Sequence, residues 1–323
     1  MQRAASNTVV VLGTGGTISG SAASPDDNVG YVAGMVGIDA LVASAPGSSE
    51  VAIETEQIAQ LDSKDMDFTT WRRLAERVAH HAVRPEVAGI VVTHGTDTLE
   101  ETAYFLSRVV AVEKPVLLTG AMRPATSREA DGPRNLADAI AVAAMPGNAG
   151  VAVVFAGTVH SAHDVRKLHP SRLDAFASGD AGPLGQVEAG RLTILRAWPR
   201  EHALGLDLLP ERASAWPWVE IVTSAAGVDG RAVAALVDAG VDGLVIAATG
   251  NGSLHRELAA ALEQAIRRRP VPILRATRCL DGTLAEKDEP AAFASGGDLT
   301  PVKARVELVL RLLQARAGVL PGG

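Results

Sequence analysis

The chain has 323 residues, which is enough for about two domains of ordinary size. Its 30 basic and 37 acidic residues give a net charge of −7, which argues against nucleic acid or an anionic membrane as partner and favours a small molecule. A hydrophobic content of 47% with 21% charged residues is typical of a globular protein and argues against disorder, collagen or coiled coil. The single cysteine, Cys279, cannot form an intrachain disulfide, which fits a reducing compartment.

The first apolar stretch, Thr8–Leu12, runs directly into a glycine turn instead of the long apolar core of a secretory leader. No apolar run reaches the roughly 18 to 20 residues that are needed to span a bilayer. We therefore expect a soluble cytoplasmic protein without a membrane partner, or a periplasmic one if a leader has been removed.

Short runs of Val, Ile and Leu alternate with longer helical patterns, which predicts an α/β fold with buried parallel strands and crossover helices. The predicted strands are Thr8–Leu12, Ala88–Thr93, Pro115–Thr119, Val151–Ala156, Leu192–Arg196, Val219–Thr223, Gly243–Ala248 and Val271–Leu274. The predicted helices are Phe68–His81, Leu99–Val110, Pro133–Met145, Arg231–Ala239, Leu254–Arg268 and Val302–Ala317.

Two domains follow from a loosening of this pattern. Residues 191–217 contain several prolines and show no sustained period, which is typical of a linker. We expect a larger N-terminal domain over residues 1–190, with a parallel-rich sheet flanked by helices and carrying the catalytic motifs. A smaller α/β domain follows over residues 218–323.

The first candidate site is Gly13-Thr14-Gly15-Gly16-Thr17, directly after the first strand. A dinucleotide fingerprint is excluded, because Ile18 stands where its third glycine belongs, and no phosphate loop is present. The glycine turn can bring backbone close to a ligand and present Thr17. The polar segment 13–37 is predicted to be an active-site lid. The alternative is a threonine that only makes local hydrogen bonds.

A second cluster, Thr93–Glu101, also lies between a buried strand and a helix. Helix capping accounts for Asp97 or Thr98, but it does not explain His94, Gly95 or Thr96. The loops 120–124 and 163–167 bring further polar groups to the same sheet edge, where α/β folds bind ligands. A lysine that is desolvated between a threonine and an aspartate is a candidate base there.

A metal centre has weaker support. His160 and His163 are three residues apart in a predicted loop, with His169 nearby, but no second cluster completes a ligand set and the H-E-x-x-H pattern is absent. We expect neither a metal nor a cofactor.

The stretches Leu12–Ile18 and Val92–Ala103 resemble the two signature motifs of the bacterial L-asparaginase and glutaminase-asparaginase family. The resemblance covers nearly the whole chain in the expected order. It continues through Gly120–Pro124, Ala130–Leu136, Asp164–Lys167, Gly182–Gly185, Gly250–Leu254 and Pro301–Arg305.

This resemblance implies a two-step acyl transfer. Thr17 would attack the side-chain amide of Asn or Gln and release ammonia, and water would hydrolyse the acyl-enzyme. Tyr31, in the lid, corresponds to the tyrosine that partners this threonine. Thr96, Lys167 and Asp97 correspond to a second group that orients the amide or activates a hydroxyl or water. How the labour is divided between the two threonines stays open.

The resemblance also implies the binding residues. The Thr96 N–H, with Ala121 reached through water, corresponds to the oxyanion site. Ser63 corresponds to the serine that binds the substrate α-carboxylate, and Asp97 pairs with the α-ammonium. Ser253 falls where a neighbouring subunit reaches the site, so we expect a homotetramer built as a dimer of dimers.

Two departures from the family pattern stand out. Lys64 occupies a substrate-binding position where Gln or Glu is usual, which changes the charge beside the substrate carboxylate. The region 275–295 is shorter than in relatives, and Glu286 is the candidate for the acidic residue that a neighbouring subunit supplies.

Three alternatives stay open. A non-catalytic amino-acid binding or sensing protein could share this fold, but it would have no use for two threonines together with Tyr31 and Lys167. A metal-dependent hydrolase would need His160 and His163 as ligands. A tRNA-dependent amidotransferase subunit would usually carry an additional N-terminal domain.

Overall fold

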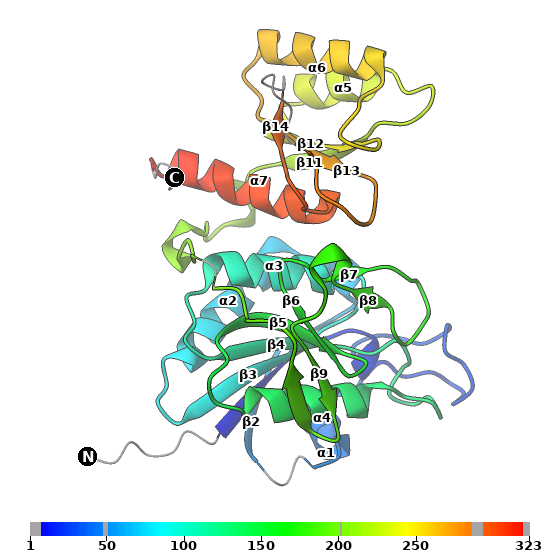
Figure 1. Cartoon of the computed structure of the whole chain (residues 1–323), viewed down its shortest axis with the longest axis vertical. Coiled ribbons are helices and arrows are strands. Elements are labelled where there is room, and N and C mark those ends of the chain that lie inside the picture. The colour runs from blue at the N-terminus through cyan, green and yellow to red at the C-terminus, as the bar shows by residue number, and fades with distance from the viewer. Residues whose placement is uncertain (1–7, 48–50, 201, 286–292, 319–323) are drawn as a thin grey trace. The chain divides into compact units, whose positions relative to one another are not determined.

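The computed structural model describes residues 8–47, 51–200, 202–285 and 293–318 (Figure 1). Contacts group the chain into two compact units, Met1–Leu206 and Asp207–Gly323. Both units alternate strands and helices, which confirms the predicted α/β class.

The described residues of the first unit form an eight-stranded sheet in the order β10-β9-β6-β5-β4-β3-β1-β2. Neighbouring strands from β2 to β5 pair in parallel, and β6, β9 and β10 add an antiparallel edge. The sheet strands are β1 (Thr8–Gly15), β2 (Ala52–Leu61), β3 (Val87–Thr93), β4 (Pro115–Thr119), β5 (Gly150–Phe155), β6 (Thr158–Ser161), β9 (Gly185–Glu188) and β10 (Arg191–Ile194). A separate antiparallel pair consists of β7 (Arg166–Lys167) and β8 (Phe176–Ala177).

Helices cover both faces of this sheet, with α2 and α3 on one face and α1 and α4 on the other (Figure 1). Alternate residues of β1 explain this arrangement, because Val9 and Val11 belong to the core that α1 and α4 complete. On the other face, Trp71 of α2 stacks on Phe105 of α3 with ring centroids 4.7 Å apart. The helices are α1 (Ile38–Ser44), α2 (Phe68–Ala82), α3 (Leu99–Val109) and α4 (Gly132–Ala143), with 3-10 turns η1 (Thr17–Ser19), η3 (Ser63–Asp65) and η4 (Gly179–Ala181).

The second unit has its own core around a parallel sheet in the order β11-β12-β13-β14. Its elements are β11 (Val219–Thr223), α5 (Arg231–Asp238), β12 (Gly243–Ala248), α6 (Arg256–Arg268), β13 (Ile273–Thr277), β14 (Ala294–Ser295) and α7 (Pro301–Arg316), with the 3-10 turn η6 (Ala213–Ala215). The turn η5 (Leu206–Leu208) lies where the two units meet in the sequence.

Several elements were not predicted from the sequence, among them α1, β2, β6 and β9, and β13 begins later than the strand predicted over 271–274. Pro272 lacks the N–H that a strand position uses for pairing, and β13 starts after it. Strand β10 and the division after Leu206 both fall inside the predicted linker 191–217, and the domain boundaries stay a prediction. Within the described residues, no helix combines the length and the apolar run that crossing a bilayer requires.

Candidate active site

Two loops from the ends of β1 and β3 touch backbone to backbone. Gly15 and Gly16 have φ angles of 104° and 83°, a left-handed region that favours glycine. A side chain on Gly16 would lie 2.3 Å from the Cα of Gly95, so this contact also requires glycine. Because Thr17 follows Gly16 and Thr96 follows Gly95, both predicted threonines lie beside this contact.

The Thr17 hydroxyl is paired with the phenol of Tyr31, and their oxygens are 2.6 Å apart. Thr17 is buried, whereas the segment that carries Tyr31 lies largely at the surface. A backbone bridge between Ser21 and Val32 folds this segment back toward β1. Either oxygen can donate in the Thr17–Tyr31 bond, so a proton can pass along it in either direction.

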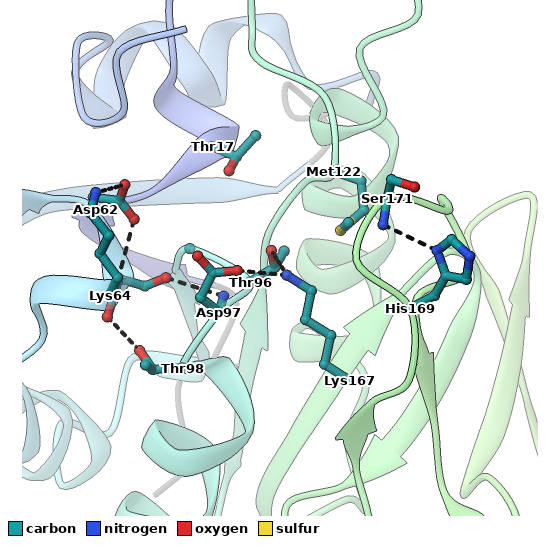
Figure 2. A network of polar contacts seen from close by, with 12 residues as sticks. Thr17, Asp62, Lys64, Thr96, Asp97, Thr98, Met122, Lys167, His169 and Ser171 are labelled. Carbon is teal, nitrogen blue, oxygen red and sulfur yellow. Dashed lines mark hydrogen bonds and ion pairs between the residues drawn. The ribbon is translucent and has the colours of Figure 1, made fainter. Parts of the chain in front are cut away.

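The Thr96 hydroxyl has a charged partner. The Lys167 Nζ, in β7, donates to Thr96 Oγ1 over 2.9 Å and to Asp97 Oδ1 over 2.7 Å (Figure 2). Because Thr96 accepts this bond, its own proton is free to be donated elsewhere. The structure therefore brings together all three members of the predicted second group, and Thr17 lies on the neighbouring loop.

Ser63 and Lys64 lie at the 3-10 turn η3. The Ser63 hydroxyl is buried and accepts from the Asp97 N–H over 3.2 Å, while its carbonyl accepts from the Thr98 hydroxyl over 2.7 Å. Lys64 differs, because its ammonium is exposed and pairs with Asp62, a hydrogen bond that raises the pKa of Lys64. Ser63 thus supports the turn over residues 94–98 between β3 and α3, which we call the Thr96 turn. Lys64 lies exposed at the rim of the candidate site.

The loop after β4 carries Ala121, which is fully buried. The Asp131 carboxylate accepts from the Met122 N–H over 2.9 Å and from the Arg123 N–H over 2.9 Å, while burial raises the pKa of Asp131. The sequence indicated Asp131 only as part of a helix start. Helix α4 does begin there, but no side-chain bond from Asp131 caps it, because the carboxylate holds this loop instead.

The two predicted contributions from a neighbouring subunit fall in the second unit. Ser253 is exposed and forms a backbone bridge with Thr249. Glu286 lies outside the described residues. Their roles stay predictions.

The histidines weighed as metal ligands have separate partners. His160 Nδ1 lies 2.7 Å from the Ser178 hydroxyl, and the His163 ring lies 6.0 Å from the ring of Tyr104. In these contacts the two rings engage different side chains.

One buried histidine received no role from the sequence. The His94 ring lies behind the Thr96 turn, with Nδ1 2.7 Å from the Gly95 carbonyl oxygen and Nε2 2.9 Å from the Thr102 hydroxyl. Burial lowers the pKa of His94 to about 4, so the ring is neutral at pH 7. The sequence offers one indication of such a role, because helix capping does not explain a histidine at this position.

Comparison with known proteins agrees with the motifs. Residues 8–200 match the family described as "Asparaginase, N-terminal", and residues 218–317 match "Glutaminase/Asparaginase C-terminal domain". The chain belongs to the asparaginase family. The N-terminal match of this asparaginase-family chain contains both threonine loops, Tyr31 and Lys167.

This chain is similar to other members of the asparaginase family over nearly its whole length. It is 37% identical to the "L-asparaginase 2" of Escherichia coli K12, over 95% of this chain and 89% of that protein. It is 36% identical to the "Glutaminase-asparaginase" of Pseudomonas fluorescens biotype A, over 95% and 87%. A crystal structure described as "Probable Cytoplasmic L-asparaginase" from Campylobacter jejuni aligns with a TM-score of 0.87 at 36% identity, covering 95% of each chain.

Proposed function

We propose that this protein is an L-asparaginase, which releases ammonia from the side-chain amide of L-asparagine, and that L-glutamine is its alternative substrate. Family membership and the names of its relatives support the reaction class. The observation that carries the mechanism is the close backbone contact between Gly16 and Gly95, because the two loops that it joins carry differently partnered hydroxyls on Thr17 and Thr96.

In the first step, Thr17 Oγ1 forms a bond to the amide carbon of the substrate. The Thr17 proton passes to the Tyr31 oxygen, and the phenolic proton of Tyr31 passes to the departing nitrogen. The carbon–nitrogen bond breaks, ammonia leaves, and an ester to Thr17 remains.

In the second step, a water oxygen attacks the ester carbon and the bond to Thr17 breaks. One water proton returns to the Thr17 oxygen, and the product is the free carboxylic acid, which ionises to aspartate. Thr96 can orient this water because its hydroxyl proton is free, and the Lys167 ammonium beside it favours the negative charge that develops.

The remaining residues bind the amino-acid part of the substrate. Asp97 offers a carboxylate for the α-ammonium, and Ser63 a hydroxyl for the α-carboxylate. The N–H of Thr96, with Ala121 reached through water, would receive the oxyanion.

The test is an ammonia-release assay on the purified protein with L-Asn, L-Gln and their D-isomers, with and without a chelator. We expect release from L-Asn that is insensitive to the chelator, and rapid acid quenching should trap an acyl ester on Thr17. Thr17→Ala should abolish turnover and the ester, yet keep the fold and much of the substrate affinity, because the hydroxyl is needed for covalent chemistry. Binding of L-Asn by the wild-type protein without ammonia release would instead support the amino-acid sensor. Chelator sensitivity would point to the metal-dependent hydrolase.

We also propose a cytoplasmic homotetramer, in which Ser253 approaches the site of another subunit. Sizing of the active species in solution tests this assembly. A fully active monomer would contradict the shared site and leave the Thr17 mechanism intact.

A further inference from the structure

Behind the Thr96 turn, three side chains form a continuous buried hydrogen-bond chain. The Trp71 Nε1–H, from α2, donates to Thr102 Oγ1 over 2.8 Å, and the Thr102 hydroxyl, from α3, lies 2.9 Å from His94 Nε2. His94 Nδ1 is 2.7 Å from the Gly95 carbonyl oxygen. The Trp71 ring is nearly buried, and Thr102 and His94 are fully buried.

The partners at the two ends fix the direction of this chain. The Gly95 carbonyl can only accept, so His94 Nδ1 carries the proton. In a neutral ring Nε2 then accepts, and its donor is the Thr102 hydroxyl. Thr102 can give its proton to His94 because its oxygen already accepts from Trp71. The low pKa of His94 agrees with a neutral ring.

The Gly95 carbonyl belongs to the same peptide group as the Thr96 N–H. A trans peptide is planar, and its C=O and N–H point in opposite directions. None of the described peptide bonds is cis. A carbonyl that is fixed toward the buried His94 ring therefore turns the Thr96 N–H away from the ring, and among the described residues no acceptor pairs with that N–H.

The turn is also held at its other contacts. The His94 N–H donates to the Thr119 carbonyl over 2.8 Å, which joins the turn to β4. A side chain on Gly95 would lie 2.5 Å from the Ser63 hydroxyl, so that face of the turn is closely packed. Among the described residues, the bond from His94 is the hydrogen bond that the Gly95–Thr96 peptide group itself makes.

We propose that His94 is a positioning residue for catalysis, which the Trp71–Thr102 chain holds in one tautomer so that it aims the Gly95–Thr96 peptide at the reacting amide. This inference rests on the proposed function for the role of the Thr96 N–H. His94 does not touch substrate in this scheme. It acts through the peptide that follows it.

The experiment compares Thr102→Val, which removes the donor to His94, with Thr102→Ser, which keeps it. We expect Thr102→Val to lower kcat about tenfold or more with little change in KM, because an oxyanion donor is used chiefly in the transition state. Thr102→Ser should restore most of the rate. Ser107→Ala is the matched control, since it removes another buried hydroxyl of α3, bonded to the Tyr104 carbonyl, and should leave kcat unchanged.

A second measurement does not depend on activity. Nitrogen-15 NMR of the histidine rings distinguishes a protonated from an unprotonated ring nitrogen, and the His94 signals are identified by their loss in His94→Gln. We expect a protonated Nδ1 and an unprotonated Nε2 at pH 7 in the wild-type protein and in Thr102→Ser.

The possible results separate the two proposals. A proton on Nε2, or equal losses of kcat in Thr102→Val and Thr102→Ser, would overturn the positioning role. A change confined to KM would overturn it as well. If the wild-type protein releases no ammonia from any amide tested, the proposed function fails, while the NMR result still decides whether the tautomer is fixed.

Discussion

The two threonine loops lie side by side, but their hydroxyls are held in different ways. Thr17 is paired with one neutral phenol, Tyr31, from a largely exposed segment. Thr96 is paired with the charged Lys167, and its turn is supported from behind by the buried His94.

This difference matches two requirements of the proposed reaction: the partner of the nucleophile must move for substrate and product, and the groups that stabilise charge must stay in place. The Val29, Val32 and Met35 side chains are exposed on the segment around Tyr31, so these three side chains add little packing that would oppose its displacement when substrate enters or product leaves. The Thr96 turn instead rests on the fully buried His94 and Thr102. This support suits donors that must already be oriented when negative charge develops on the substrate. We infer a movable partner for the nucleophile and a fixed frame for charge stabilisation.

Among the side chains that partner the two threonines, Lys167 on the charged side is expected to give the largest effect. Lys167→Met keeps a side chain of similar length but removes the ammonium between Thr96 and Asp97. We expect kcat to fall about 10³-fold, within the range typical of losing one preorganised donor that stabilises developing charge. The full pH–rate profile should be measured, because normal activity with an unchanged profile would reduce Lys167 to a salt-bridge residue.

The fixed frame should also have a pH signature in stability. Folding lowers the pKa of His94 from 6.5 to about 4, so between these values the unfolded chain binds a proton that the folded protein excludes. The contribution of His94 to the free energy of unfolding should therefore be fully present above pH 6.5. Its loss should lower that free energy by about 3 kcal/mol as the pH drops toward 4. Urea unfolding across this range measures it. His94→Gln should remove this part of the pH dependence, and an unchanged slope in that variant would assign the loss to other groups.

The fold was predictable where burial leaves a simple pattern. Strand β3 is almost wholly apolar and was predicted nearly in full, whereas β2 at the sheet edge was missed. Glu54 and Glu56 interrupt the apolar pattern of β2 and pair with Arg84 and Arg77. Such partners lie far away in the sequence, and an edge strand that mixes apolar and polar residues on both faces gives no clear period to detect.

The site was predictable to a similar depth. Glycine turns after buried strands pointed to Thr17 and Thr96, and the loop 163–167 at the same sheet edge indicated a lysine as candidate base. The role of Tyr31 followed only from the family resemblance. The support of His94 was not predictable, because it depends on side chains from two helices that meet only in the folded chain.

The movable side of the comparison is tested by Tyr31→Phe, which removes the phenolic oxygen 2.6 Å from the Thr17 hydroxyl and keeps the ring against Gly20. We expect kcat to fall by about a hundredfold and KM to change less, because the lost group transfers a proton and does not bind the substrate. Steady-state kinetics with L-Asn give both constants. An effect on KM alone would make Tyr31 a lid contact and no more.

The smallest effect is expected at the rim, where Lys64 belongs to neither threonine site. Its ammonium is exposed and pairs with Asp62, so it can influence the substrate carboxylate mainly through its charge. Lys64→Gln should change KM or the Asn:Gln preference by a few-fold with little change in kcat. A contact away from the scissile amide stabilises the bound substrate and the transition state alike, so it changes binding and not the chemical step. The difference between variant and wild type should shrink as salt is raised, since exposed charges are screened over about 10 Å at 0.1 M salt. Kinetics with both substrates at low and high salt provide the measurement. A large loss of kcat would assign Lys64 to the same charge-stabilising group as Lys167. Unchanged KM and substrate preference would show that Lys64 has no part in substrate binding.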